Sequence, residues 1–411
     1  MRTRLARAIV QRAAYRVPVR LNFPDGSSVG GGSAADPAVE LVRPQALFGR
    51  IARHPKIGLG EGYMAGDWRV AEGSDLAAFL LPFAARITEI LPPWMMALRG
   101  VVDRRIPHVQ RNTLGGSRRN IAAHYDLSNG LFAAFLDETL SYSSALFRHD
   151  QPIAQQPLAD AQRRKIEAAL DAAGVADGTR LLEIGTGWGS LAIAAAERGA
   201  QVTTITLSAE QRALAIERIA AAGQSERVDV LLKDYREVRG EYDAIVSIEM
   251  IEAVGDEFWP TYFQTLDARL APGGRICVQA ILMDHDRYLA TRNSFGWIQK
   301  YIFPGGMIPT VTAIRGVIAE GTDLKLVSAH HFGASYAETL RRWRAEFNRQ
   351  WPGIQQLGFD ETFRRMWEYY LAYCEAGFAS GYLDVAQLVL AGRHELAGAG
   401  AHAGDRVRAA A

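Results

Sequence analysis

The sequence predicts an α/β fold with a doubly wound, mostly parallel sheet and a smaller N-terminal domain. Three observations lead to this prediction. From residue 181 onward, short apolar runs alternate with helical periodicity, which is typical of parallel strands joined by crossover helices. One strand ends in Glu183 and opens into three alternating glycines. The first hundred residues lack this pattern and contain turn-rich stretches at 24–26 and 30–32.

The elements of the sheet follow in order along the chain. Strands are predicted at 180–184, 201–207, 228–232, 244–248 and 275–281, and helices near 190–197, 209–221 and 259–269. The last strand follows a Pro-Gly-Gly turn at 272–274. Ligands of such sheets bind beyond the carboxyl ends of the strands, near the point where the strand order reverses. We therefore expect the functional site at that edge.

Composition divides the chain into four parts. Residues 1–100 are predicted to form a small domain that associates with lipid or membrane, and 101–119 a basic linker. Residues 120–392 form the predicted catalytic domain, and the Ala- and Gly-rich segment 393–411 a disordered tail. Six arginines and no acid occur in residues 1–20, which favours contact with an anionic bilayer surface. A solvated N-terminus is the alternative.

The overall composition excludes several function classes. The formal net charge is +1, and no run of eighteen apolar residues indicates a membrane span. A nucleic-acid partner is not expected, because the chain has neither an excess of positive charge nor a pattern of basic and aromatic residues. The two cysteines, Cys277 and Cys374, stand far apart without a zinc pattern. We therefore expect no metal and a cytoplasmic location.

The glycine turn carries the strongest functional signal. Glu183, Gly185, Gly187 and Gly189 have the spacing E-x-G-x-G-x-G, whereas the dinucleotide fingerprint requires glycine at position 190, which is Ser190. Glycine lets the backbone turn sharply and lets a ligand approach it closely. Glu183 offers a carboxylate to an ammonium group, and the turn lacks the fingerprint that binds phosphate. These two features suit S-adenosylmethionine. A glycine-rich turn without a ligand is the alternative.

Polar residues after the next two strands extend this expected site. Thr206 and Leu207 end the second strand, and Gln211 lies on the following helix. Asp234 and Tyr235 follow the third strand and offer an acid for the adenine amino group and an aromatic face for stacking. In this order and at this spacing, the residues predict a cofactor site of the methyltransferase type.

Six further segments carry a resemblance to a known family. They read AHYDLSN at 123–129, LSYSSA at 140–145, EMIEAVG at 249–255, QKYIFPGG at 299–306, GASYAETL at 333–340 and MWEYYLAYCEAGF at 366–378. At these residues the chain strongly resembles the cyclopropane-fatty-acyl-phospholipid synthases, over about 120–390 and more loosely before. EMIEAVG and VQAI are most similar to the subgroup that makes methylene-branched acids of the tuberculostearic type. The resemblance implies a seven-stranded, Rossmann-like methyltransferase sheet.

The resemblance also implies the reaction and its site. The methyl group of S-adenosylmethionine would move to a cis double bond in an unsaturated phospholipid acyl chain, and bound bicarbonate would deprotonate the resulting carbocation. Tyr142, Ser143 and Glu249 are implied to bind the cofactor. The residues implied to hold bicarbonate are Ser144, Glu252, Gln279, Ile281 and Tyr336. Two of them depart from the family pattern, because many relatives have cysteine at 144 and histidine at 279.

Aromatic side chains are expected around the carbocation, because their faces stabilise a cation without trapping it. Tyr142, Trp297 and Tyr301 are the candidates. Core packing is the alternative for each of them.

The product and the partners stay open at this point. Proton loss from the transferred methyl with ring closure gives a cyclopropane, whereas a hydride shift before that loss gives a methylene group, which a separate reductase would saturate. We expect peripheral contact with the inner face of the membrane and a homodimer as one assembly. The alternatives are a small-molecule S-adenosylmethionine methyltransferase and a catalytically silent homologue that binds lipid or cofactor.

Overall fold

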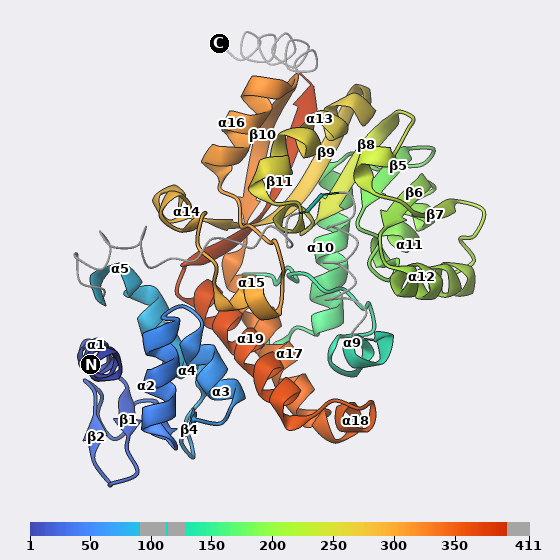
Figure 1. Ribbon diagram of the computed structural model, residues 1–411. Coiled ribbons are helices and arrows are strands. Elements are labelled where there is room, and N and C mark those ends of the chain that lie inside the picture. The colour runs from blue at the N-terminus through green and yellow to red at the C-terminus, as the bar shows by residue number, and fades with distance from the viewer. Residues whose placement is uncertain (91–111, 114–127, 393–411) are drawn as a thin grey trace, which may run out of the picture. The chain divides into compact units, whose positions relative to one another are not determined.

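The computed structural model describes residues 1–90, 112–113 and 128–392 (Figure 1). The chain divides into two compact units. The first unit consists of residues 1–107, 291–304 and 336–383, and the second of 108–290, 305–335 and 384–411. The linker predicted at 101–119 lies almost wholly outside the described residues, as does the whole tail at 393–411. The four functional parts inferred from composition stay a prediction.

The first unit begins with a small sheet and its helices. The sheet has the order β2-β1-β3-β4 and is formed by β1 (Arg20–Asn22), β2 (Ser28–Val29), β3 (Ala38–Leu41) and β4 (Trp68–Val70). Around it are α1 (Arg2–Ala14), α2 (Pro44–Arg53), α3 (Gly58–Met64), α4 (Leu76–Ala85) and α5 (Ile87–Ile90). Helix α4 begins at Asp75 because that carboxylate accepts a hydrogen bond from the Ala78 amide.

Later segments of the chain complete the core of the first unit. They are α15 (Trp297–Tyr301), most of α17 (Gly333–Arg349), α18 (Trp351–Gln356) and α19 (Glu361–Ala379). Helix α19 packs against α3 and α4. The buried Trp68 ring lies 4.9 Å from Tyr63, 5.8 Å from Phe79 and 6.3 Å from Tyr369. This aromatic cluster therefore joins residues of the N-terminal segment to α19.

The second unit contains a seven-stranded sheet among the described residues, with the order β10-β11-β9-β8-β5-β6-β7. The strands are β5 (Arg180–Ile184), β6 (Gln201–Thr206), β7 (Val228–Leu232), β8 (Tyr242–Ile248), β9 (Leu270–Met283), β10 (Leu324–His331) and β11 (Leu383–Gly392). Parallel pairs join β5 to β6 and β8, β6 to β7, and β8 to β9, while β10 and β11 are antiparallel. The predicted doubly wound, mostly parallel sheet is confirmed.

Helices cover this sheet in two groups. Helix α10 (Leu158–Ala172) contacts α11 (Ser190–Glu197), and α11 contacts α12 (Ala209–Ala221). Helix α13 (Trp259–Arg269) contacts α16 (Val311–Gly321). Because the chain leaves β5 toward β6 in one direction and β8 toward β9 in the other, right-handed crossovers place α11 and α13 on opposite faces. Among the residues that the structure describes, the remaining helices are α9 (Asn129–Phe135), α14 (His285–Thr291) and the single turns η2 (Ile153–Gln155), η3 (Tyr235–Glu237), η4 (Ile251–Ala253) and η5 (Asp256–Phe258).

One predicted boundary differs from the structure. The Pro-Gly-Gly turn at 272–274 lies inside β9 rather than before it. The register between β9 and β8 shifts here, because Leu270 lies opposite Tyr242 whereas Arg275 lies opposite Ala244. Within the turn, Gly273 has φ 79°. The turn therefore forms an irregularity in a longer strand, since hydrogen bonding resumes on both sides of it.

The carboxyl ends of β5, β6, β7 and β8 lie at one edge of the sheet, because these strands are parallel. The strand order reverses between β5 and β8. This edge therefore receives the glycine turn after β5, the start of α12 after β6, Lys233 after β7 and Glu249 after β8.

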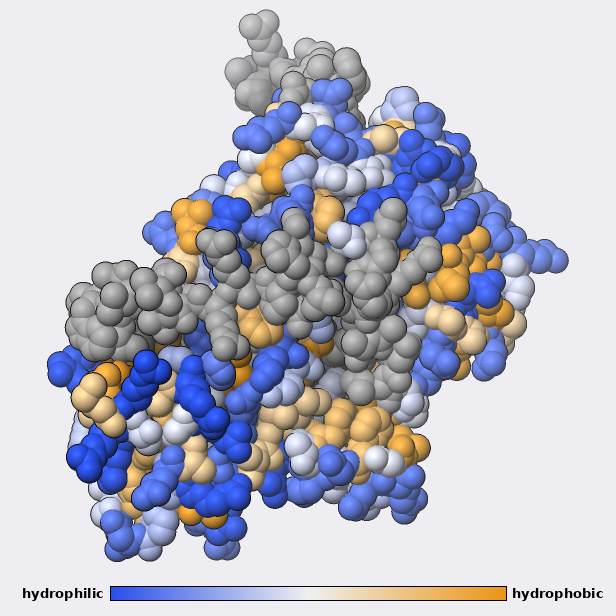
Figure 2. Space-filling model, viewed as in Figure 1, coloured by the Kyte–Doolittle hydropathy of each residue, from blue (hydrophilic) through white to orange (hydrophobic). Residues whose placement is uncertain are grey.

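Among the described residues, no helix is long and apolar enough to cross a membrane. Large exposed apolar side chains, such as Leu5, Ile216 and Leu232, come from separate elements. On the face seen in Figure 2, hydrophobic residues stand among hydrophilic ones.

Candidate active site

The glycine turn has the backbone geometry that its sequence predicts. Gly185, Gly187 and Gly189 all have positive φ, at 101°, 52° and 91°. A Cβ atom at Gly185 would lie 2.6 Å from Met250 Cγ, whereas one at Gly187 would meet no atom within 4 Å. The backbone at Gly187 therefore borders open space.

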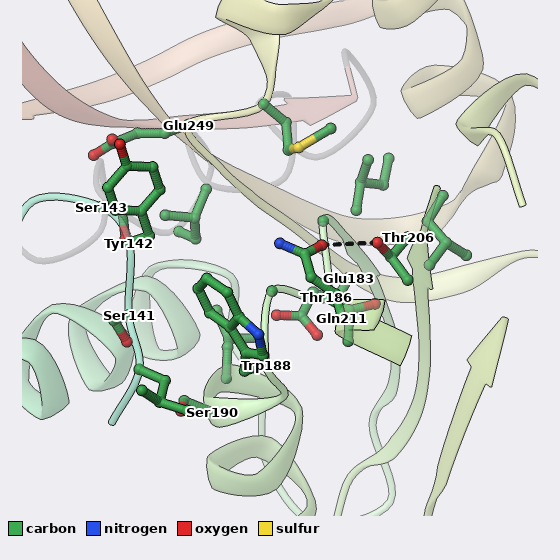
Figure 3. A pocket seen from close by; sticks show the side chains of 18 of the residues that line it. Ser141, Tyr142, Ser143, Glu183, Thr186, Trp188, Ser190, Thr206, Gln211 and Glu249 are labelled. Carbon is green, nitrogen blue, oxygen red and sulfur yellow. Dashed lines mark hydrogen bonds between the residues drawn. The ribbon is translucent and has the colours of Figure 1, made fainter. Parts of the chain in front are cut away.

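That open space is a pocket at the carboxyl edge of the sheet. Its lining includes ten residues predicted to bind the cofactor: Tyr142, Ser143, Glu183, Gly185, Gly187, Thr206, Leu207, Gln211, Tyr235 and Glu249. Lys165, Trp188 and Met250 line it as well. Residues from β5, β6, the loop before α10 and the segment after β8 therefore meet at one cavity (Figure 3).

Two predicted cofactor residues do not line this pocket. Gly189 is the N-cap of α11, and a Cβ atom there would lie 3.4 Å from Ala215 Cβ on α12. The Asp234 carboxylate binds the Arg236 guanidinium at 2.7 and 2.8 Å and caps η3. In the structure, Gly189 serves helix packing, and both oxygens of Asp234 have partners within the protein.

One end of the pocket presents a hydroxyl and an amide. The Thr206 hydroxyl donates to Gln211 Oε1 at 3.0 Å, so the Gln211 amide nitrogen points away from Thr206 (Figure 3). Ser208 caps α12 by accepting from the Gln211 amide at 3.2 Å, which fixes the first turn that carries this side chain. This end can therefore donate and accept hydrogen bonds with a polar ligand such as a ribose.

Glu183 lies beside that end with its carboxyl buried. The Thr204 hydroxyl donates to Glu183 Oε2 at 2.6 Å and lies 2.7 Å from Thr186 Oγ1. Burial raises the pKa of Glu183 to about 8, although the hydrogen bond from Thr204 and the charge of Lys165 lower it. A buried carboxyl of this kind favours a cationic partner, because a nearby positive charge stabilises its ionised form.

The opposite end of the pocket holds a buried polar cluster. Glu249 Oε1 accepts hydrogen bonds at 2.9 Å from the Ser144 amide and from Gln279 Nε2. Lys165 Nζ donates to the Ser143 hydroxyl at 2.7 Å. Burial lowers the pKa of Lys165 to about 8, while the charge of Glu249 raises it. Glu249 and Lys165 are therefore close enough to interact electrostatically behind Tyr142 and Ser143.

Glu252 lies near this cluster, on η4. Its Oε1 accepts a hydrogen bond from the Ile281 amide, and its Oε2 has no hydrogen-bond partner among the described residues. Burial, and then the charge of Glu249, raise the pKa of Glu252 to about 8. Ser144 and Gln279 thus meet at the Glu249 carboxylate, and Ile281 meets the Glu252 carboxylate.

The remaining predicted residues belong to the first unit. Tyr336, on α17, is buried and packs against Phe378 with ring centroids 4.4 Å apart. Trp297 packs against Tyr369 at 4.9 Å, and the Tyr301 hydroxyl donates to Glu61 at 2.8 Å. Core packing accounts for the position of Trp297, and the catalytic roles of these three residues stay a prediction. Among the described residues, no group of three or more His, Cys, Asp or Glu is placed to hold a metal.

Known proteins are similar in sequence to this chain over nearly its whole length. A family model described as mycolic acid cyclopropane synthetase matches residues 113–388. Tuberculostearic acid methyltransferase UfaA1 of Mycobacterium tuberculosis is 50% identical over 389 residues, which cover 94% of this chain and 90% of that protein. The chain belongs to the cyclopropane synthase family. The cyclopropane-fatty-acyl-phospholipid synthase of Escherichia coli is 32% identical over 391 residues, covering 91% and 92%.

A solved member of the cyclopropane synthase family has the same fold. The mycolic acid cyclopropane synthase CmaA1, crystallised with SAH and CTAB, superposes with a TM-score of 0.60 at 28% identity and covers 69% of this chain and 98% of that one. The family and the Rossmann-like methyltransferase fold expected from the sequence are both confirmed.

The sequence analysis missed three residues at or near the pocket of the present chain. Lys165 lies on amphipathic α10, where a lysine ordinarily faces solvent, and Gln387 lies on β11. Neither position carries a local signal, because each reaches the pocket region only through the tertiary fold. Trp188 did carry a signal, since it stands inside the glycine motif, and its Nε1 donates to Asn129 Oδ1 at 2.8 Å.

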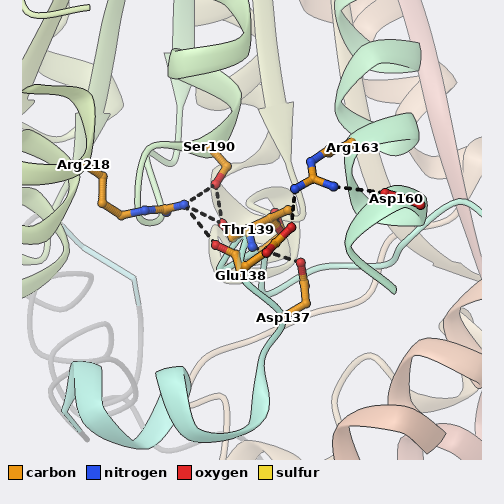
Figure 4. A network of polar contacts seen from close by, with 8 residues as sticks. Asp137, Glu138, Thr139, Asp160, Arg163, Ser190 and Arg218 are labelled. Atoms are coloured by element: carbon orange, nitrogen blue, oxygen red, sulfur yellow. Dashed lines mark hydrogen bonds and ion pairs between the residues drawn. The ribbon is translucent and has the colours of Figure 1, made fainter. Parts of the chain in front are cut away.

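An arginine ties the loop before Tyr142 to the glycine turn (Figure 4). Arg218, on α12, donates to the Trp188 carbonyl at 2.6 Å and to the Thr139 and Glu138 carbonyls at 3.2 and 3.3 Å. Its side chain also reaches the Ser190 hydroxyl at 3.2 Å. Two walls of the pocket are therefore held together by one guanidinium group.

We expect Arg218→Met to lower the free energy of unfolding by roughly 1–3 kcal/mol, because partly buried carbonyls lose a charged donor. The change should also weaken S-adenosylmethionine binding by loosening the loop. Arg163→Met is the matched control, since Arg163 pairs with Glu138 and Asp160 on the surface, where such pairs contribute about 0–1 kcal/mol. Urea unfolding of both variants tests this, and equal losses would contradict the role given to Arg218.

Proposed function

We propose that the protein transfers the methyl group of S-adenosylmethionine to a cis double bond in the acyl chain of a membrane phospholipid. The product would be a cyclopropane or a mid-chain methylene-branched acyl chain. The observation that carries this proposal is family membership together with a pocket, at the strand switch point, that has a glycine turn but no phosphate-binding fingerprint. The names of the relatives at 50% and 32% identity support the fatty acyl substrate.

The pocket suggests how the cofactor would lie. Thr206 and Gln211 would bind the ribose, and Glu183 the cationic part of the methionine moiety, since their polar groups face one cavity. Tyr142 and Ser143 would close over the sulfonium. Tyr235 lines the same pocket and offers an aromatic face for adenine.

An alkene is a poor nucleophile, so the protein must supply alignment and exclude water. The π electrons attack the sulfonium methyl, a carbon–carbon bond forms, and the carbon–sulfur bond breaks with its electron pair left on sulfur. Positive charge then develops on the neighbouring chain carbon. Tyr142 lines the pocket, and its aromatic ring would stabilise that charge.

A bicarbonate base, implied by the sequence resemblance, does not fit the donors of the second unit. The Ser144 amide and Gln279 Nε2 already bind the Glu249 carboxylate, and the Ile281 amide binds Glu252. The Ser144 hydroxyl donates to the Ala145 carbonyl at 2.9 Å. A bicarbonate placed there would meet a carboxylate instead of unpaired donors, and like charges at contact repel. These donors therefore leave no binding site for this ion.

Contact with the bilayer is proposed to be peripheral. Helix α1 exposes Arg2, Arg4 and Arg12, and each arginine near an anionic surface contributes about 1 kcal/mol. Sedimentation with anionic vesicles should therefore weaken as salt is raised, and sedimentation that is independent of salt would contradict this contact.

The proposed function is tested with pure protein, S-adenosylmethionine labelled in its methyl group, and phospholipid vesicles. We expect label in the lipid with oleoyl chains and none with stearoyl chains, which have no double bond. Ozonolysis then separates the products, because a methylene group is cleaved and a cyclopropane is not. Methylation of soluble amines or phenols without vesicles would instead support a small-molecule methyltransferase, and cofactor binding without turnover a silent homologue.

A further inference from the structure

The Glu249 carboxylate occupies the donors that the family resemblance assigns to an external base. Its Oε1 accepts from the Ser144 amide and from Gln279 Nε2, both at 2.9 Å. Ser144 and Gln279 are fully buried. Two positions implied to hold a small anion therefore hold a carboxylate of the chain itself.

The backbone of Glu249 is held in an uncommon conformation that brings about this contact. Its φ is 50°, in the left-handed region that side chains other than glycine rarely adopt. The Glu249 amide donates to the Gln279 carbonyl at 2.8 Å, which extends the pairing of β8 with β9 by one residue. Strained residues of this kind cluster at functional sites.

A buried amide relay fixes the direction of Gln279. Gln387 Nε2 donates to Gln279 Oε1 at 3.2 Å and to the Lys165 carbonyl at 3.0 Å. Because Gln279 Oε1 accepts a hydrogen bond from Gln387, the amide nitrogen of Gln279, and not its oxygen, faces Glu249. The relay therefore presents a donor, and a donor stabilises an ionised carboxylate.

The two neighbouring carboxyl groups differ in their surroundings. Glu252 receives one amide hydrogen bond, and burial together with the charge of Glu249 raises its pKa to about 8, which favours its protonated form. Glu249 receives two donors and interacts with the Lys165 charge. Hydrogen bonds donated to a carboxylate favour its ionised form, and Glu249 receives more of them than Glu252.

Glu249 also lies at the proposed cofactor pocket. It lines the cofactor pocket together with Tyr142 and Ser143, and Figure 3 places it at the Tyr142 end, away from Thr206 and Gln211. If Thr206 and Gln211 bind the ribose, the sulfonium lies toward this end.

We infer that the Glu249 carboxylate is the general base of the reaction and takes the place of bicarbonate. This inference rests on the proposed function. After methyl transfer, a C–H bond of the transferred carbon breaks, and its electron pair closes the ring or, after a hydride shift, forms the methylene double bond. The proton passes to Glu249, which becomes a neutral acid and later releases it to water. No oxidant or further reactant is needed.

The first experiment compares wild-type turnover on oleoyl vesicles in buffer stripped of carbon dioxide with turnover in added bicarbonate. We expect equal rates. A loss of activity that bicarbonate restores would overturn the inference while leaving the proposed function intact. A wild-type protein that binds S-adenosylmethionine but transfers no label under either condition would overturn the proposed function itself, and with it the inference.

Two substitutions at position 249 then separate a base from a structural carboxylate. Glu249→Gln should lower kcat about 10²- to 10⁴-fold, the usual contribution of a general base, and change the S-adenosylmethionine Kd by only a few-fold. Glu249→Gly suits the positive φ and leaves room for a small anion, so added formate or bicarbonate should restore part of the rate. A proportionate loss of kcat and affinity in both variants, without rescue, would overturn the inference.

Glu252→Gln is the matched control. The amide is isosteric with a protonated carboxyl, so this variant should lose much less kcat than Glu249→Gln. A larger loss at 252 than at 249 would identify Glu252 as the base and contradict the inference.

Discussion

We expect the Gly187→Val protein to fold normally and to lose S-adenosylmethionine binding. A Cβ atom at this position meets no protein atom within 4 Å, so the new side chain would stand in the cofactor pocket rather than in the core. The positive φ of 52° adds strain for a branched residue. Calorimetry should show an affinity at least about a hundredfold lower, equivalent to about 2.8 kcal/mol.

Gly223→Val is the control for Gly187→Val. It introduces similar backbone strain outside the pocket, so it separates the effect of strain from the effect of filling the space of the ligand. Gly223 follows α12 on the surface, has φ 71° and likewise has no atom within 4 Å of an added Cβ. It should therefore show similar strain and an unchanged S-adenosylmethionine affinity. Equal affinities for wild type and Gly187→Val would show that the ligand does not pass Gly187.

The second large effect is expected at Glu183. Glu183→Gln replaces a carboxylate by a neutral amide in a buried site, and hydrogen bonds to charged groups contribute roughly 1.5–3 kcal/mol. S-adenosylmethionine should therefore bind roughly ten- to a hundredfold more weakly. Glu197→Gln, on the exposed end of α11, serves as the control and should bind normally.

The pH dependence of binding follows from the same carboxyl. Burial raises the pKa of Glu183 to about 8, which favours the protonated carboxyl below that pH. A cationic ligand favours the ionised form, and binding below pH 8 therefore releases a proton. Affinity should rise with pH up to about 8 and then level off.

Other ionisable side chains also line the pocket. Burial lowers the pKa of Lys165 to about 8, and Lys233 and Glu249 lie in the same lining. The slope of affinity against pH must therefore be compared with that of Glu183→Gln, which should be flatter. Identical slopes in the two proteins would mean that Glu183 does not contact the cation.

The parts of the site that follow a strand directly were predictable from the sequence. Gly185 and Gly187 follow β5, and Thr206 ends β6 only a few residues before Gln211. In a parallel sheet, successive strand ends meet at one edge, so local patterns are enough to assemble these residues.

The polar cluster around Glu249 was less predictable. The contacts of Glu249 with Ser144 and Gln279 join residues far apart in the sequence, and the relay through Gln387 depends on β11 lying beside β9. The resemblance implied seven strands, but the positions of β10 and β11 were not predicted, because an apolar run in a sequence does not indicate where in a sheet it inserts. Asp234 was expected to face adenine, but the sequence did not reveal that Arg236, two residues later, binds its carboxylate.

The most direct test of the account follows the hydrogens of the transferred carbon. Wild-type protein is incubated with S-adenosylmethionine carrying a fully deuterated methyl group and with oleoyl-phospholipid vesicles, and the fatty acids are analysed by mass spectrometry. We predict one added carbon that keeps two of its three deuterons, because both the cyclopropane and the methylene product arise by loss of one hydrogen from that carbon. An acyl chain that keeps all three deuterons, or formation of S-adenosylhomocysteine without any label in the lipid, would contradict the account.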